Sequence, residues 1–220
     1  MLLLHGFPDS WLLWRHQVGA LAAAGHRVLA PDLRGFGQSA RPGAVEAYRM
    51  RTLVADVTGL LDLAGVRQAA LVGHDWGAAL AWRVAMYAPD RVERLAVVSV
   101  GHPLAGVAVG LPQRQLSWYV LWFLFPPRRP GGRPQLVPGQ QRPRPVPGLR
   151  PGPVPDAKVA CPTLGFWSSD PVLSEAQMTG SADYVTGPWR YERLEGIDHW
   201  VPVHAPDQLS QLLVEFLGIT

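Results

Sequence analysis

Hydrophobic residues along the chain fall into two alternating patterns. Short apolar runs that end in turn residues predict strands at 2–6, 27–32, 69–75, 95–101, 163–169 and 190–196. Apolar residues at helical spacing lie between or after these runs, at 14–21, 53–61, 77–87 and 209–216. Strands that alternate with helices predict an α/β fold, with a mostly parallel sheet covered by helices on both faces. In such a fold, active-site groups gather at the carboxyl ends of the strands.

The segment from Pro126 to Pro155 follows neither pattern. It contains eleven prolines, six arginines and no acidic or aromatic residue. A composition of this kind buries too little apolar surface to offset its ordering entropy, so we expect an extended or disordered linker. A basic, RNA-binding tail is the less favoured interpretation of the same composition.

Composition and charge narrow the class of protein. A chain of 220 residues, 48% of them apolar, is long enough for one domain with a sizeable core. The formal net charge is +3, but outside residues 126–155 the acidic residues outnumber the basic ones, 17 to 14. We therefore expect neither nucleic acid nor an anionic membrane as a partner. A single cysteine, no basic leader and no apolar run of about eighteen residues make a cytoplasmic protein the expectation.

Six residues, GHDWGA at 73–78, carry the clearest chemical signal. They follow an apolar strand and open an alanine-rich helix, so Asp75 lies in a tight strand-to-helix turn. Such a strained turn requires small residues two positions before and after its centre, and it exposes the central side chain as a nucleophile above the sheet. The alternative is that Asp75 only caps the following helix, because aspartate is a good N-cap residue.

Later residues provide an acid and a base in the order that such a nucleophile requires. Asp170 follows the strand predicted at 163–169, and His199 lies on a loop near the C-terminus. Asp198 is a poorer candidate acid, because its position beside His199 directs its side chain awkwardly for a hydrogen bond to the imidazole. His204 lies near the start of the last helix, where we expect a surface residue.

Backbone groups near Asp75 add a candidate oxyanion hole. HGFP, residues 5–8, directly follows the first predicted strand, and Trp76 directly follows Asp75. The N–H groups of Phe7 and Trp76 can converge on one oxygen, as do the donors that stabilise a tetrahedral intermediate. An ordinary turn at the end of a strand is the alternative for HGFP.

Together these motifs resemble the α/β-hydrolase superfamily and, within it, the epoxide hydrolases. The resemblance covers residues 1 to about 125 and about 158 to 220, and it is carried by HGFPDSWLLWRHQVGALAAAGHRVLAPDLRGFGQS, GHDWGA and GIDHW. It implies that Asp75 is the nucleophile, that His199 is the base and that Asp170 is the acid that orients the base. It implies no cofactor and no metal.

The resemblance also implies a helical cap that supplies a ring-opening tyrosine. RQLSWYVLWFLFP, residues 114–126, is similar to the first cap helix, and Tyr119 occupies the position of the first such tyrosine. A buried aromatic helix is the equal alternative for this stretch. We therefore expect the first part of the hydrolase core at 1–110, a remnant cap helix with a Pro/Arg/Gly-rich linker at 111–157, and the second part of the core at 158–220. The cap is expected to be reduced and partly disordered.

The chain departs from the family pattern in three places. It begins inside the first family strand that it matches, without the antiparallel pair that usually precedes it. The Pro/Arg/Gly stretch stands where further cap helices and a second tyrosine are expected. Trp167 and Asp170 are three positions apart, where the family commonly has four. A fragment, or a frameshift in a GC-rich coding sequence, would explain the first two, and 19 of the 20 basic residues are arginine.

A carboxylate nucleophile suits a different substrate from a serine, because it can displace a leaving group at an sp³ carbon and become an ester itself. The interpretation is that Asp75 opens a small apolar epoxide with help from Tyr119, and that His199 then activates water to release a vicinal diol. Haloalkane dehalogenases follow the same two steps, but they usually carry a halide-binding asparagine where this chain has Phe7. A catalytically degenerate fragment is the other alternative.

Overall fold

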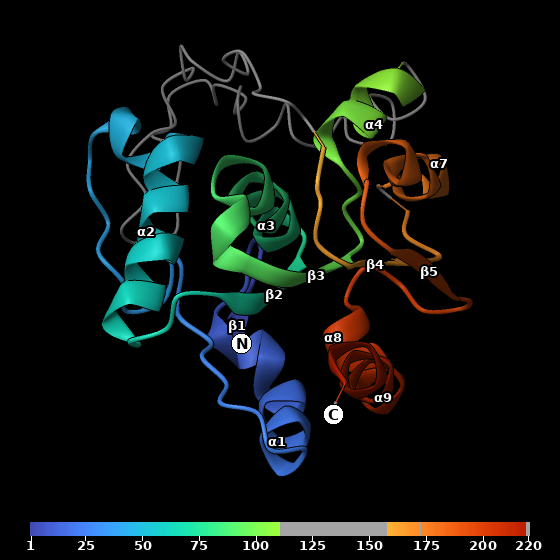
Figure 1. Ribbon diagram of the computed structural model, residues 1–220, viewed down its shortest axis with the longest axis horizontal. Helices are drawn as coiled ribbons and strands as arrows, with labels where there is room; N and C mark the ends of the chain where they lie inside the picture. Colours follow the sequence, from blue (N-terminus) through green and yellow to red (C-terminus); the bar gives the residue numbers. More distant parts are fainter. Residues whose placement is uncertain (111–157, 172, 219–220) are drawn as a thin grey trace, which may run out of the picture.

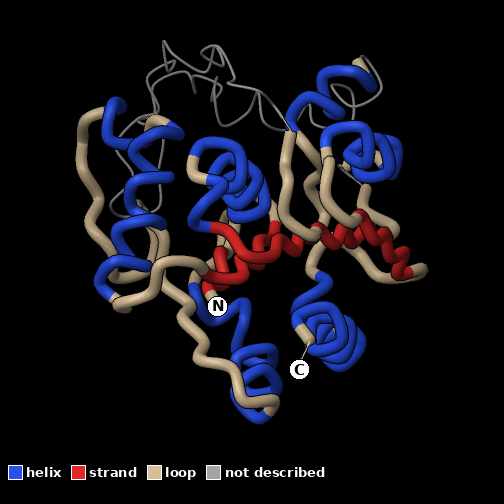
Figure 2. Tube along the Cα trace, in the orientation of Figure 1, coloured by secondary structure: helices blue, strands red, loops and turns tan. Residues whose placement is uncertain are grey.

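A five-stranded parallel sheet forms the centre of the computed structural model, which describes residues 1–110, 158–171 and 173–218 (Figures 1 and 2). The strands pair in chain order, as β1 (Leu2–Leu4), β2 (Ala69–His74), β3 (Val92–Val98), β4 (Thr163–Ser168) and β5 (Trp189–Leu194). Every neighbouring pair is parallel. The carboxyl ends of all five strands therefore meet at one edge of the sheet.

Helices cover the sheet on both faces (Figure 1). One face carries α2 (Met50–Leu63), α3 (Trp76–Tyr87), α4 (Pro103–Val109) and α7 (Glu175–Thr179). The other carries α1 (Arg15–Ala23), α8 (Val201–His204) and α9 (Pro206–Leu217). Short 3-10 helices lie at Trp11–Trp14, Val45–Tyr48, Pro89–Arg91 and Gly180–Tyr184. The predicted α/β class, with a parallel sheet between two helical layers, is confirmed.

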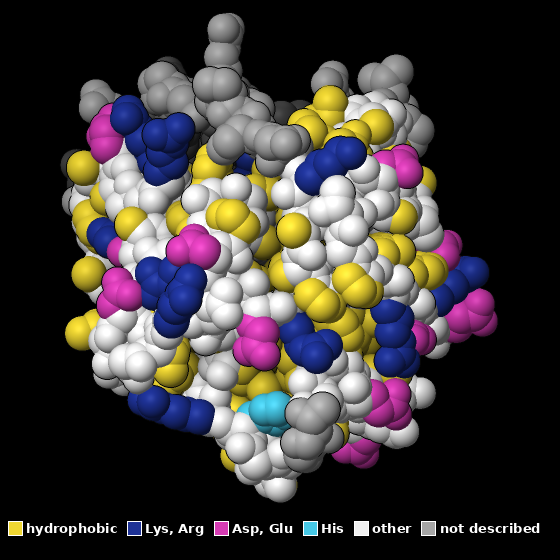
Figure 3. Space-filling model, in the orientation of Figure 1, with side chains coloured by type: hydrophobic (Ala, Val, Ile, Leu, Met, Phe, Trp, Pro, Cys, Tyr) yellow, Lys and Arg dark blue, Asp and Glu magenta, His cyan; other side chains and the backbone are white. Residues whose placement is uncertain are grey.

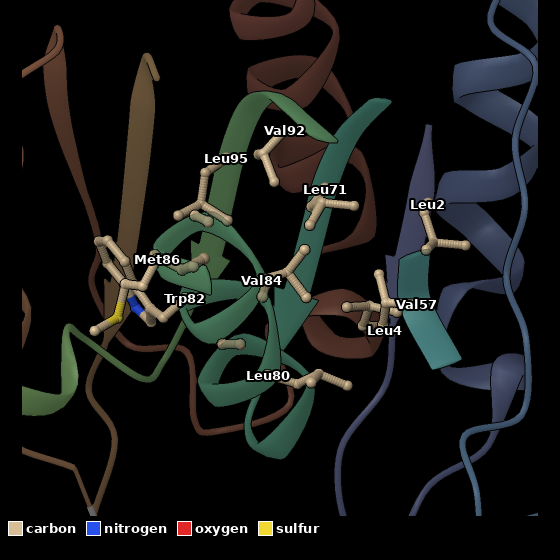
Figure 4. Packing of buried hydrophobic residues seen from close by; sticks show 14 of the residues in the cluster. Leu2, Leu4, Val57, Leu71, Leu80, Trp82, Val84, Met86, Val92 and Leu95 are labelled. Atoms are coloured by element: carbon tan, nitrogen blue, oxygen red, sulfur yellow. The ribbon is translucent and has the colours of Figure 1, made fainter. Parts of the chain in front are cut away.

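Side-chain alternation along the strands divides the core into two clusters. Leu2 and Leu4 of β1 join the cluster under α2 and α3, whereas Leu3 joins the cluster formed with α1 and α9. The same alternation runs along β2 and β3, where Leu71 and Leu95 belong to the first cluster. Figure 4 shows these side chains packed against residues of α3. Because β1 and β2 are buried on both faces, they are almost continuous apolar runs in the sequence.

The prediction of a strand at 27–32 is wrong. Residues 27–32 form no strand, and Leu29 makes only an isolated parallel bridge to Leu2. Two hydrogen bonds hold it there, from Leu3 N–H to the Leu29 carbonyl at 2.8 Å and from Leu29 N–H to the Met1 carbonyl at 3.0 Å. The neighbouring strand, β1, has three residues. In a parallel ladder the next donor toward β1 would be residue 31, and Pro31 has no N–H, so the pairing stops at Leu29 and the run continues as a loop.

The exposed surface carries charges of both signs. Figure 3 shows Lys or Arg and Asp or Glu side chains interspersed over one face, with hydrophobic side chains exposed over α4. Val107 of α4 is 65% exposed. Within the described ranges, no helix is both long and apolar enough to cross a lipid bilayer. Residues 111–157, to which the sequence assigns the cap remnant and the linker, lie outside the described residues.

Two leucines test this account of the core. Leu71 of β2 is fully buried, whereas Leu63 at the end of α2 is 87% exposed. Leu71→Ala should lower the free energy of unfolding by about 2–5 kcal/mol, because it leaves a cavity between strand and helix. Leu63→Ala should change it by no more than about 0.5 kcal/mol. Urea unfolding of both variants measures the difference, and equal losses would contradict the assignment of these two positions.

Candidate active site

The turn from β2 to α3 holds Asp75 in a strained backbone conformation. Asp75 has φ 54° and ψ −122°, in a region that residues with a side chain rarely adopt. Gly77 explains why the turn can be so tight. A Cβ atom at Gly77 would collide with the backbone carbonyls of Leu4 and His5, so only glycine lets α3 begin against β1. The turn predicted from GHDWGA thus has the geometry that exposes a side chain at the carboxyl end of β2.

The Asp75 carboxylate is directed away from the helix that it precedes. Asp75 occupies the N-cap position of α3, but its side chain makes no capping hydrogen bond. Its Oδ1 instead accepts a hydrogen bond from Phe7 N–H at 2.9 Å, and its Oδ2 lies 3.6 Å from Nε2 of His199. Burial acts to raise the pKa of Asp75, but the nearby His199 and His74 and the backbone N–H groups of Phe7 and Trp76 hold it below its ordinary value. The carboxylate is therefore ionised at neutral pH.

Asp170 and His199 meet on the other side of this carboxylate. Asp170 follows β4, and His199 lies in the loop between β5 and α8. Nδ1 of His199 is 2.5 Å from Oδ2 of Asp170, whose Oδ1 accepts a hydrogen bond from Leu173 N–H at 3.1 Å. Burial acts to lower the pKa of His199, but its hydrogen bond with Asp170 and the nearby carboxylate of Asp75 raise it to about 9. The imidazole bridges the two carboxylates as a cation at neutral pH.

The structure brings five of the six predicted site residues into one place. His199 is hydrogen-bonded to Asp170 and makes an ion-pair contact with Asp75 at 3.6 Å, so the three side chains form one series. The backbone N–H groups of Phe7 and Trp76 lie beside Asp75. Tyr119, the sixth, lies outside the described residues. The spacing of Trp167 and Asp170 does not prevent Asp170 from reaching the histidine.

The two poorer candidates lie apart from this series. Nδ1 of His204 is 2.7 Å from Oδ1 of Asp198, and the two side chains are about half exposed. Asp198 also accepts a hydrogen bond from Trp200 N–H at 3.0 Å. Asp198 and His204 therefore pair with each other near the surface, and His204 is the surface residue that the sequence predicts.

Three buried side chains near the site were not anticipated as functional. His5 accepts a hydrogen bond from Leu33 N–H at 2.9 Å on Nε2 and lies 2.9 Å from the Gly6 carbonyl on Nδ1, so it fixes the loop that carries Phe7. His74 and Ser99 both contact the backbone of His199. The available signal was a polar residue at the end of an apolar strand, a pattern that is too common to identify them.

A hollow among the described residues lies at the opposite edge of the sheet from Asp75. A cavity of about 230 Å³ is lined by Met1, Ala69 and Arg94, at the amino ends of the strands. Asp75 lies at the carboxyl ends, where the helix N-terminus and the polar side chains converge. Within the described residues, no group of three or more His, Cys, Asp or Glu side chains is arranged to hold a metal ion. The arrangement suits proton transfer and attack by a carboxylate.

Comparison with known proteins places the chain in a family. Residues 1–200 match the family described as the alpha/beta hydrolase fold. Epoxide hydrolase A of Mycobacterium tuberculosis is 31% identical over an alignment that covers 99% of this chain and 89% of that protein. Epoxide hydrolase B of the same organism is 53% identical, over 58% of this chain and 37% of that protein, so this chain spans little more than a third of it.

A solved structure shares the arrangement of the elements. The crystal structure of epoxide hydrolase A from Mycobacterium thermoresistibile matches with a TM-score of 0.74 and 27% identity, covering 98% of this chain and 90% of that one. The parallel sheet, the strained turn at Asp75 and these matches agree with one another. The chain belongs to the α/β-hydrolase fold family and is epoxide hydrolase-like within it.

Proposed function

We propose that this protein hydrolyses small apolar epoxides to vicinal diols through an ester formed on Asp75. The observation that carries the proposal is a carboxylate in the strained turn after β2, with one oxygen on a backbone N–H and the other facing an imidazole. Serine hydrolases have a hydroxyl at this point, which exchanges acyl groups. A carboxylate instead attacks a saturated carbon and forms an alkyl ester. The similarity to enzymes named epoxide hydrolases supports the choice of leaving group.

The two oxygens of Asp75 have different surroundings and so different roles. Oδ1 accepts from Phe7 N–H, which leaves Oδ2 as the nucleophile. Attack by Oδ2 on an epoxide carbon breaks one carbon–oxygen bond of the ring, and the released oxygen takes a proton. By the family resemblance, the donor of that proton is Tyr119. The low pKa of Asp75 keeps the nucleophile ionised without help from a base.

Hydrolysis of the ester needs a base, which we assign to His199. Nε2 of His199 removes a proton from water as the water oxygen bonds to the Asp75 carboxyl carbon. Negative charge then develops on Oδ1, where the N–H groups of Phe7 and Trp76 stabilise it. As this intermediate collapses, His199 returns its proton to the departing oxygen and the diol is released. The acid left on Asp75 then ionises, and His199 takes up that proton. Asp170 orients the imidazole and stabilises its charge throughout.

The proposal also names the reactants and a location in the cell. The substrate is an apolar epoxide and the second reactant is water. We retain a cytoplasmic location, and no nucleic-acid partner, as predictions from the sequence.

The ester should accumulate when the base is removed. In His199→Gln, Asp75 can still be alkylated but water is not activated, so ester decay should slow by about 100-fold or more. Intact mass after exposure to an aryl epoxide should show an adduct with the full mass of the epoxide. An adduct formed only with a chloroalkane would support dehalogenation instead.

Two variants control this trapping experiment. His204→Gln replaces an exposed histidine that pairs with Asp198 and contacts neither Asp75 nor Asp170, and it should accumulate no adduct. Asp75→Ala combined with His199→Gln removes the nucleophile, so the mass should stay that of the protein alone. Failure of folded His199→Gln to form an adduct with either reagent would exclude the proposed ester.

Hydrolysis of the ester should speed up as the pH rises. In the free protein the pKa of His199 is raised to about 9, partly by the charge of Asp75. Alkylation neutralises Asp75, so the pKa of His199 falls below that value in the ester and the neutral base becomes available. Ester decay, followed by quenching and mass measurement, should rise with pH and level off at an apparent pKa below 9.

Asp170→Asn should move this plateau to lower pH, because it removes a second group that favours the imidazolium. The rate at the plateau should also fall, because the imidazole loses the carboxylate that orients it. Ester decay that does not depend on pH in the parent protein would rule out His199 as the base.

A further inference from the structure

The backbone carbonyl of His199 is held by two buried side chains from different strands. Nε2 of His74, at the end of β2, lies 2.8 Å from this oxygen, and Oγ of Ser99, just after β3, donates to it at 3.3 Å. His74 is fully buried and Ser99 is 1% exposed. The residues are 125 and 100 positions from His199 along the chain. One acceptor atom thus joins the loop of His199 to the two central strands.

His74 occupies a position that its own chemistry makes unfavourable. Burial first, and then the positive charge of His199, lower the pKa of His74 to about 4, so the ring is neutral. A carbonyl oxygen only accepts hydrogen bonds, so Nε2 carries the proton and Nδ1 is left as an acceptor. Nδ1 is buried and has no hydrogen-bond partner within the described part of the chain. An apolar residue would avoid this unpaired atom, and the bond to His199 is what the histidine adds.

Ser99 is likewise placed against its backbone preference. Its φ is 71°, in the left-handed region that glycine adopts without strain. Glycine would therefore fit the turn after β3 better than serine does. What the serine adds is a hydroxyl that reaches the same carbonyl oxygen as His74. Two unfavourable placements converge on one atom.

A neighbouring contact extends the same arrangement to β4. Oγ of Ser168, which is fully buried at the end of β4, donates to the Asp198 carbonyl at 2.8 Å. The carbonyls of residues 198 and 199 are therefore both fixed to strand ends. With Asp170 holding Nδ1 of the imidazole at the other end of the side chain, the direction of Nε2 toward Asp75 is determined.

We propose that His74 and Ser99 are positioning residues, which fix the backbone of His199 so that its imidazole meets the ester formed on Asp75. The proposal rests on the two-step mechanism above and assigns these residues to its second step. Of Asp75, Asp170 and His199, alkylation requires only the Asp75 carboxylate, which Phe7 N–H holds independently of His199. Hydrolysis requires Nε2 of His199 to be aimed at a water molecule, and misplacement of a base by about 1 Å can slow such a step about 100-fold.

Paired substitutions at each position test the proposal. Ser99→Ala and Ser99→Gly both remove the hydroxyl, and Ser99→Gly also relieves the backbone strain. His74→Leu removes the donor, whereas His74→Gln retains an N–H at the end of the side chain. Thr163→Val is the matched control, because it removes a buried hydroxyl that donates to the Cys161 carbonyl at 3.0 Å at the amino end of β4.

The measurements are the rates of alkylation and of ester decay after mixing with an aryl epoxide. Ser99→Ala, Ser99→Gly and His74→Leu should slow ester decay about tenfold or more and accumulate adduct, with alkylation changed less than about threefold. His74→Gln should recover most of the rate, and Thr163→Val should behave as the parent protein. If the Ser99 hydroxyl had no positioning role, Ser99→Gly would be more stable than the parent protein and its ester would decay at the parent rate. That result would overturn the proposal. The serine variants carry the test if His74→Leu does not fold.

A second readout separates this proposal from the proposed function. Proton NMR follows the Nδ1–H of His199 in its hydrogen bond to Asp170 without any turnover. This resonance should shift or broaden in Ser99→Ala and His74→Leu and stay unchanged in Thr163→Val. If His199→Gln forms no adduct, the reaction assignment fails and NMR alone tests the positioning role. An unchanged resonance together with unchanged ester decay would overturn the positioning role even if the ester is found.

Discussion

The close approach of α3 to β1 is the contact on which the site depends. Gly77, in the first turn of α3, leaves no room for a side chain beside the backbone carbonyls of Leu4 and His5. That approach brings the loop after β1 within reach of Asp75, so that Phe7 N–H meets the carboxylate. Gly6 shows the same constraint from the other side, because a Cβ there would collide with the Asp75 carboxylate. Two glycines therefore let a helix, a strand and a loop share one small volume.

Charge is balanced within this volume rather than by solvent. Asp75, Asp170 and His199 are each 7% exposed, and an isolated charge at that depth would be strongly disfavoured. The imidazolium between two carboxylates, with backbone donors on Asp75, compensates most of the desolvation. Any step that neutralises one member changes the proton affinity of the others. The series is therefore a coupled unit in which chemistry at Asp75 adjusts the base.

Much of this could be predicted from the sequence, because the relevant signals are local. Strand and helix periods give the fold class, and the glycines around Asp75 identify the turn. The order of Asp75, Asp170 and His199 along the chain identifies the partners, and parallel pairing brings them together. The strand expected at 27–32 is absent because its backbone pairing with β1 stops at Pro31, which has no N–H, and the apolar pattern does not show which N–H groups a neighbouring strand requires.

The bonds from His74 and Ser99 escape sequence reasoning for a related reason. Each joins a side chain to a backbone carbonyl a hundred or more positions away. Every amino acid has the same backbone carbonyl, so the residue type at position 199 does not show that its carbonyl accepts these bonds. Only the burial of a polar side chain hints at such a contact, and that hint does not identify the acceptor.

The pairing of β3 with β4 has a consequence for how such proteins diversify. Leu95–Val98 pair with Thr163–Phe166, so the sheet itself joins residues that more than sixty positions separate in the chain. The entropy cost of closing a chain segment grows only logarithmically with its length, by about 0.6 kcal/mol per doubling. The core can therefore accept segments of very different length and composition between these strands. An α/β-hydrolase core of this design can therefore acquire different inserted segments between β3 and β4 during evolution, while the pairing of the strands and the residues at their ends stay unchanged.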